Sequence, residues 1–139
     1  MSIVYADIVG DLFHFGHVQF LKSIKTRFPD CKLIVGVLSD TDVEKYKRLP
    51  IMTMAERIQA VQECKYVDSV LAAVPLVVTE AFMLLHGIDY VVHAHDIDDT
   101  QYDKSYAVPM QLGKFVRFEY NHAISTTDII QRIKHRSDL

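Results

Sequence analysis

The sequence predicts an α/β fold with a mainly parallel β-sheet. Short apolar runs rich in Val and Ile alternate with amphipathic segments along the chain. Several of these runs are apolar at every position, which is typical of strands covered on both faces. Two helix-start signatures also stand among them. This alternation of strand and helix signals favours a parallel sheet with helices packed on its faces.

Five runs carry the strand signal in chain order. They have the length and composition of buried strands, with Val, Ile and aromatic residues dominating. The predicted strands are Ile3 to Ala6, Leu33 to Leu38, Ser69 to Ala72, Tyr90 to Val92 and Phe115 to Phe118.

Three helices have clear sequence signals. Apolar residues recur at helical spacing after His17, at Val18, Leu21, Ile24 and Phe28. The segment 53–56, Thr-Met-Ala-Glu, fits a capping box before a helix that carries Ile58, Val61 and Gln62. The segment 125–128, Ser-Thr-Thr-Asp, is a second such box, before Ile129, Ile130 and Ile133.

The bulk composition favours one globular domain spanning residues 1–139. Half of the residues are hydrophobic and 24% are charged, and no linker, repeat or low-complexity tract interrupts them. A net charge of -3 argues against a protein that binds nucleic-acid backbones. No signal peptide and no apolar run of membrane-spanning length is evident, so we expect a cytoplasmic protein. Cys31 and Cys64 form no CxxC pair and indicate small buried side chains rather than a disulfide.

The segment His14-Phe15-Gly16-His17 follows the first predicted strand and opens a helix. A helix N-terminus offers free N–H groups and the positive end of the helix dipole, and glycine lets a phosphate approach the backbone closely. Two imidazoles can donate hydrogen bonds to phosphate oxygens during phosphoryl transfer. Zinc is the chemical alternative, which we disfavour because no carboxylate or cysteine completes a ligand set nearby.

Further polar and basic residues stand at positions suited to phosphate binding. Three hydroxyls at Ser125, Thr126 and Thr127 begin another helix and would make an anion cradle, although an ordinary N-cap explains them when they are considered alone. Lys47 is expected in a loop after the second strand, and Arg57 on the capped helix. Nucleotidyl transfer needs such cations to hold a triphosphate and an acceptor phosphate together.

The segment 93–96, His-Ala-His-Asp, ends the fourth predicted strand. A strand places residues i and i+2 on one face, so His93 and His95 have the geometry to bind a metal together. They also suit the edge of a nucleotide base, and a purely structural role is the third alternative. We favour the base pocket, with Asp96 as part of it, and predict no metal site.

Taken together, these motifs resemble the small cytidylyltransferases that act on glycerol 3-phosphate, phosphocholine and phosphoethanolamine. The resemblance runs from Val4 to Ile133. The HxGH segment at 14–17 is the phosphate-binding motif of that superfamily, and 124–130 resembles the second half of its RTxGxSTT motif. Further matches are the blocks 33–37, 39–40, 56–57 and 65–68. HxGH alone is shared with adenylyltransferases, whereas the STT block at 125–127 and the YVD block at 66–68 favour the cytidylyl branch.

The resemblance implies a Rossmann-like doubly wound parallel sheet of five strands and transfer of CMP from CTP to a small phosphorylated alcohol. His14 and His17 would grip the triphosphate, and Lys47 would bridge the α-phosphate and the acceptor. The nucleotide-binding residues implied are Val9, Gly16, Arg57, His93, His95, Asp96, Ser125, Thr126 and Thr127. Mg²⁺ would accompany CTP, and members of the family are commonly homodimers through the regions near the first motif and the YVD segment.

The sequence departs from the family pattern around the acceptor. The usual Gly-x-Phe-Asp before HxGH is here Ile8 to Asp11, and the Arg, Thr and Gly of RTxG are Tyr120, Asn121 and Ala123. Losing that Arg removes a bidentate phosphate clamp. Asp7 resembles the partner of the ammonium group in the choline and ethanolamine branches.

We therefore expect acceptor binding by Asp7, Asp11, Tyr120 and Asn121, and favour a two-carbon acceptor like phosphoethanolamine. A phosphonate such as 2-hydroxyethylphosphonate is an alternative acceptor. Transfer of AMP, and nucleotide binding without catalysis, are alternative activities.

Overall fold

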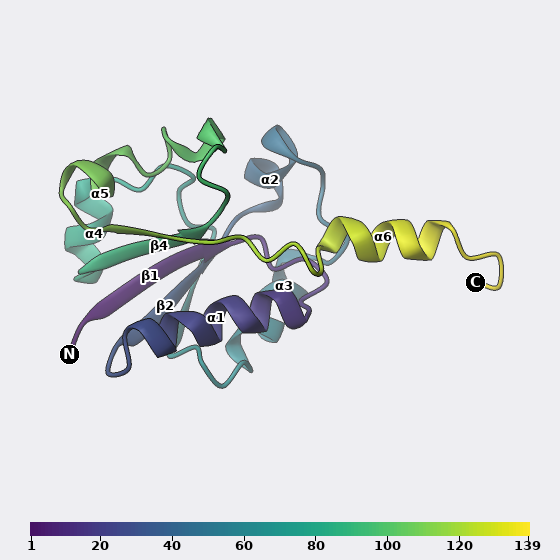
Figure 1. Ribbon diagram of the computed structural model, residues 1–139, viewed down its shortest axis with the longest axis horizontal. Helices are drawn as coiled ribbons and strands as arrows, with labels where there is room; N and C mark the ends of the chain where they lie inside the picture. The colour runs from purple at the N-terminus through teal and green to yellow at the C-terminus, as the bar shows by residue number, and fades with distance from the viewer.

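Five parallel strands form a single sheet in the computed structural model, which describes residues 1–139 (Figure 1). All five predicted strands are confirmed, and β1 and β4 extend two residues beyond the expected ends. The strands are β1 (Ile3–Ile8), β2 (Lys32–Val37), β3 (Ser69–Ala72), β4 (Tyr90–Ala94) and β5 (Phe115–Phe118).

The strand order is β3-β2-β1-β4-β5, and every neighbouring pair is parallel. The chain leaves the central strand β1 toward one edge of the sheet, then returns to β4 on the opposite side of β1. Doubly wound sheets form a crevice at the carboxyl ends of the strands where the winding direction reverses. Here that point lies between β1 and β4, so the loops after these two strands are placed to build a site.

Six α-helices and one short 3₁₀ helix connect and cover the strands. They are α1 (Phe15–Arg27), α2 (Asp40–Tyr46), α3 (Met54–Gln62), α4 (Glu80–His86), the 3₁₀ helix η1 (Thr100–Tyr102), α5 (Ala107–Gln111) and α6 (Thr126–Lys134). The sequence signals for α1, α3 and α6 are confirmed. Helices α2, α4 and α5 carry no recognisable periodicity because they are five to seven residues long and each buries a single residue.

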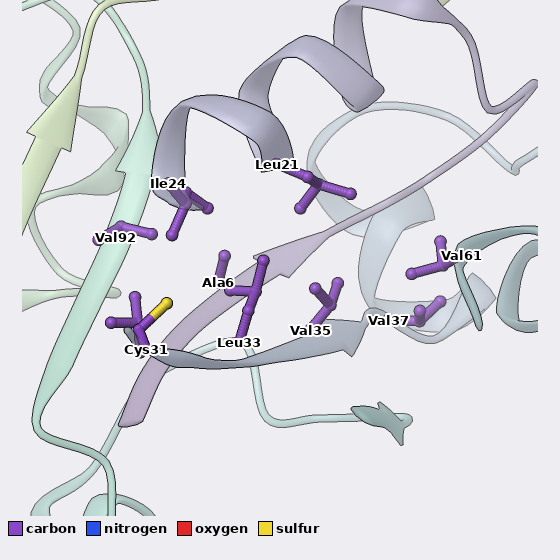
Figure 2. Close-up of a cluster of buried hydrophobic side chains, with 10 residues drawn as sticks. Ala6, Leu21, Ile24, Cys31, Leu33, Val35, Val37, Val61 and Val92 are labelled. Atoms are coloured by element: carbon purple, nitrogen blue, oxygen red, sulfur yellow. The ribbon is translucent and has the colours of Figure 1, made fainter. Parts of the chain in front are cut away.

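Two hydrophobic clusters cover the two faces of the sheet. Val4 and Ala6 of β1 pack with Leu21 of α1 and Val61 of α3 on one face (Figure 2). Tyr5 of the same strand points to the other face, where the second cluster gathers residues of α2, α4 and the segment before α5: Val43, Met83 and Tyr106. Alternate residues of one strand are thus buried on opposite faces, which explains why β1 reads as a continuous apolar run.

The helix caps position the segments that lead into the site. Thr53 and Glu56 form the predicted capping box at the start of α3. Ser125 caps α6 by accepting a hydrogen bond from the Asp128 N–H at 3.0 Å, which is half of the predicted box. Helix α6 projects away from the sheet and carries the C-terminus with it (Figure 1). No helix combines the length and apolar character that crossing a membrane requires.

Candidate functional site

A cavity of about 790 Å³ lies at the carboxyl ends of β1 and β4. It is lined by segments that are far apart in the sequence: the end of β1, the start of α1, the end of α2, the end of β4 and the start of α6. The cavity brings together most of the residues predicted for the site: Asp7, Val9, His14, Gly16, His17, Lys47, His93, Tyr120, Asn121, Ser125, Thr126 and Thr127.

The two histidines of the first motif cap helix α1 together. The His14 Nδ1 accepts a hydrogen bond from the Gly16 N–H at 3.0 Å, and the His17 Nδ1 accepts one from the His14 N–H at 3.0 Å. An imidazole nitrogen that accepts carries no proton, so in the neutral ring the proton is on Nε2. The HxGH spacing therefore fixes the tautomer of both histidines and leaves each with an Nε2–H donor.

The surroundings keep both rings neutral. Burial lowers the pKa of His17 to about 3, with smaller effects from His14 and Lys47, and burial followed by Lys47 lowers the pKa of His14. The His14 Nε2 lies 3.3 Å from the Thr126 hydroxyl, which itself donates to the Asp11 carbonyl at 2.9 Å. A chain of hydrogen bonds thus joins the start of α1 to the start of α6 across the cavity wall.

The structure explains why two positions near the first motif are occupied by glycine. A Cβ on Gly16 would lie 2.8 Å from the His14 ring, so glycine makes room for the imidazole that caps the helix. Gly10 has a φ of +70°, a conformation that glycine adopts at little cost. Leu12 also has a positive φ, of 51°, immediately before the motif. Gly10, which is displaced from its place in the family pattern, therefore lies in a sharp turn of the backbone that leads to His14 and His17.

Lys47 lies at the end of α2, not in a plain loop after β2. It lines the cavity as the C-cap residue of α2, and burial followed by the neighbouring Arg48 lowers the pKa of its ammonium group. A small pocket of about 40 Å³ adjoins this side and shares Val9, His17, Lys47 and Thr126 with the main cavity. The start of α6 and the end of α2 thus form one continuous basic and hydroxylic wall.

The cavity also holds a carboxyl group in aromatic surroundings. Asp7 is buried at the end of β1 and accepts a hydrogen bond from the Tyr106 hydroxyl. Burial raises the pKa of Asp7 to about 6, against the opposing effect of this hydrogen bond. Tyr46 and Tyr102 line the same cavity. An anionic group among tyrosine rings suits an organic cation.

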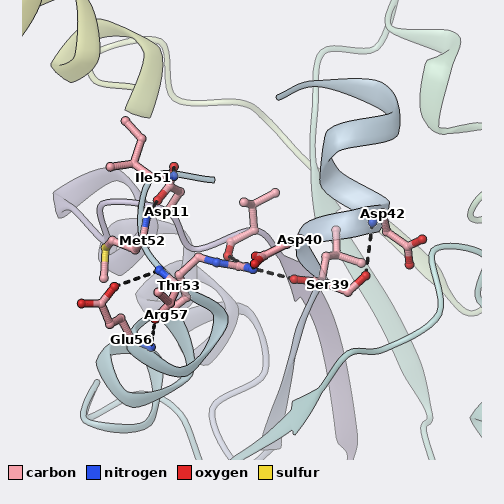
Figure 3. A network of polar contacts seen from close by, with 11 residues as sticks. Asp11, Ser39, Asp40, Asp42, Ile51, Met52, Thr53, Glu56 and Arg57 are labelled. Atoms are coloured by element: carbon pink, nitrogen blue, oxygen red, sulfur yellow. Dashed lines mark hydrogen bonds and ion pairs between the residues drawn. The ribbon is translucent and has the colours of Figure 1, made fainter. Parts of the chain in front are cut away.

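Arg57, expected at the phosphates, does not line the cavity. Its side chain is completely buried, with Nη1 donating to the carbonyls of Val9 at 2.7 Å and Leu38 at 2.9 Å. Its Nη2 lies 2.5 Å from the Asp40 carboxylate (Figure 3). The guanidinium fastens α3 to the ends of β1 and β2, and a phosphate contact would require this packing to open.

Asp11 also differs from its expected acceptor contact. Both carboxylate oxygens accept backbone hydrogen bonds, from the Ile51 and Met52 N–H groups at 2.9 Å each (Figure 3). Its side chain is buried and lies outside the main cavity. Asp11 therefore fixes the loop between α2 and α3, which follows Lys47.

The segment after β4 is divided between the cavity and the interior. His93 lines the cavity, whereas the side chain of His95 is buried and outside it, with the two Nδ1 atoms 2.9 Å apart. Asp96 also lies outside the cavity, where its carboxylate pairs with His122 at 3.0 Å. The chain contains no group of three or more His, Cys, Asp or Glu side chains arranged to hold a metal ion.

The sequence reasoning missed several lining residues. Tyr46, Tyr102 and Tyr106 come from α2, the 3₁₀ helix and the residue before α5, elements that had no periodic signal. Gln19 and Glu119 also line the cavity. The spacing of Tyr102 and Tyr106, four residues apart in a segment rich in Asp and Tyr, is the one sequence feature that points toward this aromatic wall.

Comparison with known proteins identifies relatives of this site and fold. A family model described as cytidylyltransferase-like matches residues 11–132. A choline-phosphate cytidylyltransferase of Saccharomyces cerevisiae is 41% identical over 135 residues, covering 94% of this chain and 31% of the yeast protein. Choline-phosphate cytidylyltransferase A of Homo sapiens is 40% identical over 141 residues, covering 98% of this chain and 37% of the human protein.

The ethanolamine branch is also matched. Ethanolamine-phosphate cytidylyltransferase of Mus musculus is 34% identical over 131 residues, covering 94% of this chain and 32% of the mouse protein. The chain thus spans about a third of the length of these relatives. A crystal structure of a lipopolysaccharide core biosynthesis protein from Thermoplasma volcanium has a TM-score of 0.69 at 24% identity, covering 87% of this chain and 98% of that one. This likeness confirms the Rossmann-like α/β fold.

Proposed function

Since the chain belongs to the cytidylyltransferase-like family, we propose that it transfers CMP from CTP to a small phosphorylated alcohol with a cationic two-carbon head. The observation that carries this proposal is the cavity itself. Two imidazole donors, a lysine and the start of α6 line the same cavity as a carboxyl group and several tyrosines. The first set of residues suits a triphosphate, and the second suits an ammonium group.

The reaction is an in-line substitution at the α-phosphorus of CTP. An oxygen of the acceptor phosphate attacks, a new P–O bond forms, and the bond to the β-phosphate breaks, so pyrophosphate leaves with the electron pair. The attacking oxygen is already anionic, so no general base is required. Catalysis then consists of positioning and stabilisation of the charge that spreads over the phosphoryl oxygens.

The cavity residues have distinct proposed roles. His14 and His17 donate through Nε2–H, because their Nδ1 atoms are occupied as helix caps. His17 donates to a phosphate oxygen directly, and His14 does so on exchanging the Thr126 hydroxyl for a phosphate oxygen. Lys47 bridges the α-phosphate and the acceptor phosphate. Thr127 and the free N–H groups at the start of α6 hold the remaining phosphates, favoured by the helix dipole. His93 and the end of β4 form one side of the cytosine pocket.

Mg²⁺ is part of the proposal as a companion of CTP. The carboxylates that line the cavity are Asp7, which Tyr106 already engages, and Glu119. Mg²⁺ bound to nucleotides commonly keeps phosphate oxygens and water as most of its ligands. The triphosphate would therefore supply most of its coordination, and the metal would neutralise phosphate charge.

Pyrophosphate release with an acceptor panel tests the function. CTP is offered with phosphoethanolamine, phosphocholine, glycerol 3-phosphate and 2-hydroxyethylphosphonate, and ATP replaces CTP in a parallel series. We expect turnover with CTP and the two acceptors that carry an ammonium group, phosphoethanolamine and phosphocholine. Tight CTP binding with no turnover on any acceptor would contradict the transferase. Faster turnover of the phosphonate would contradict the cationic acceptor, and a preference for ATP would contradict the choice of nucleotide.

Replacing Asp7 by Asn tests how the acceptor is chosen. The amide keeps an acceptor for the Tyr106 hydroxyl but removes the negative charge. We expect the KM for the preferred cationic acceptor to rise roughly 10- to 100-fold, the range of a charged hydrogen bond, with the KM for CTP nearly unchanged. Tyr106→Phe is the matched control, since it keeps the carboxylate and removes only its partner. Equal acceptor KM values in wild type and the Asp7 variant would rule out this role.

We also propose that the chain forms a homodimer near the first motif. Phe15 lies inside that motif and its side chain is 65% exposed, so a large aromatic surface is available there to a second copy of the chain. Light scattering coupled to gel filtration measures the mass, with Phe15→Ser as the disrupting variant. A monomeric wild type would contradict the proposal.

A further inference from the structure

The cavity has little permanent positive charge for the ligands proposed above. Lys47 is the only lysine or arginine that lines it. The arginine of the family's RTxG segment is here Tyr120, and the guanidinium of Arg57 is buried against backbone carbonyls. A triphosphate and an acceptor phosphate repel each other strongly, so one ammonium group is a weak complement for them.

Arg48 lies directly beside this site, one residue after Lys47. Its Nη1 lies 3.2 Å from the hydroxyl oxygen of Thr127, a residue of the cavity wall at the start of α6. Arg48 also lines the small pocket that shares His17 and Lys47 with the main cavity. The guanidinium therefore stands at the edge of the cavity, next to the helix end that is expected to hold the β- and γ-phosphates.

One donor of this guanidinium is unpaired. The Arg48 Nε is buried and has no hydrogen-bond partner, although buried polar groups are paired in the great majority of cases. Guanidinium groups bind phosphate oxygens through parallel N–H donors, commonly with Nε as one of them. An anion at the start of α6 would satisfy this donor and replace the hydrogen bond to Thr127.

The loop that carries Arg48 is held in place from two sides. Lys47, the preceding residue, is the C-cap of α2, and its N–H donates to the Val43 carbonyl at 2.9 Å. After it, Pro50 is buried and the Asp11 carboxylate binds the two following N–H groups. The backbone on both sides of Arg48 is thus fixed, so the guanidinium is presented to α6 by a rigid loop.

We propose that Arg48 binds the β- and γ-phosphate end of CTP and supplies the charge that Tyr120 does not. This inference rests on the proposed function, because it takes CTP as the ligand. It assigns a substrate-binding role to a residue outside the HxGH and STT motifs. It also explains how the cavity tolerates the loss of the arginine clamp.

Calorimetric titration with CTP and with CMP tests the proposal. Arg48→Ala is expected to weaken CTP binding roughly 10- to 100-fold, the range of a lost charged and bidentate contact. CMP binding should stay within about twofold, since CMP lacks the β- and γ-phosphates. Arg48→Lys keeps the charge without the fork and should give an intermediate loss. Arg136→Ala, an exposed arginine on the C-terminal segment, is the matched control.

A second variant tests whether Arg48 substitutes for the missing arginine. Adding Tyr120→Arg to the Arg48→Ala protein should recover most of the lost CTP affinity. If the CTP affinity does not recover, Arg48 does not take the place of the missing arginine. Equal weakening of CTP and CMP, or a lower melting temperature with unchanged CTP affinity, would show that Arg48 only tethers the loop to α6 and would overturn the binding role. A wild-type protein that binds no CTP would instead contradict the proposed function itself.

Discussion

His17→Ala is expected to lower kcat for CMP transfer roughly 100- to 1,000-fold, the usual cost of losing one donor to the transition-state charge. His17 lines the cavity, and its Nδ1 is occupied by the His14 N–H at 3.0 Å. The only free donor of the neutral ring is therefore Nε2–H. Since the pKa of His17 is lowered to about 3 by burial, the ring donates as neutral imidazole at pH 7.

The same substitution removes one half of the cap of α1. That loss costs about 1 kcal/mol of stability and has to be separated from the loss of catalysis. Single-turnover kinetics at saturating CTP measures the chemical step, and thermal unfolding measures the cap. His135→Ala is the control, because His135 is exposed at the end of α6 and does not line the cavity. A His17→Ala protein with the kcat of the wild type would show that the Nε2–H of His17 does not stabilise the transition state.

The fold was predictable because its signals are local. The strands β1 and β2 are buried on both faces, so most of each one is a continuous apolar run. The capping box of Thr53 and Glu56 marks the start of α3 within four residues. The short helices were missed because a helix that buries only Val43 or Met83 leaves no periodic pattern. These short helices are stabilised by packing against the rest of the protein rather than by the helix propensity of their own sequences.

The site was only partly predictable because residue type does not determine which way a side chain faces. The HxGH segment was recognisable since its two histidines and glycine act within four residues. Arg57 has the positive charge expected of a residue that binds phosphate. Its guanidinium nevertheless packs inward against backbone carbonyls, and no sequence pattern places those carbonyls beside it. Tyr106 reaches Asp7 from 99 residues away, so only the folded chain reveals the pair.

Arg57→Met is expected to lower the free energy of unfolding by about 3 kcal/mol, because it leaves buried acceptors without their donor. The guanidinium holds the carbonyls at the ends of β1 and β2, and the Leu38 carbonyl accepts from it in the interior at 2.9 Å. Asp40 contributes less, since its side chain is 43% exposed and its ion pair is screened by water. For a domain of this size, the loss corresponds to a fall in melting temperature of about 10 °C.

This variant separates a structural role of Arg57 from direct binding of phosphate by its guanidinium. If Arg57 bound phosphate directly, Arg57→Met would weaken CTP binding and leave the melting temperature nearly unchanged. If it fastens α3 to the sheet, the melting temperature of Arg57→Met falls. The Asp40→Asn variant then loses much less stability, about 0.5 kcal/mol of the free energy of unfolding. Thermal unfolding of both variants without ligand measures the difference. A melting temperature within about 2 °C of wild type for Arg57→Met would contradict the structural role, since buried carbonyls that lose a charged donor must destabilise the fold.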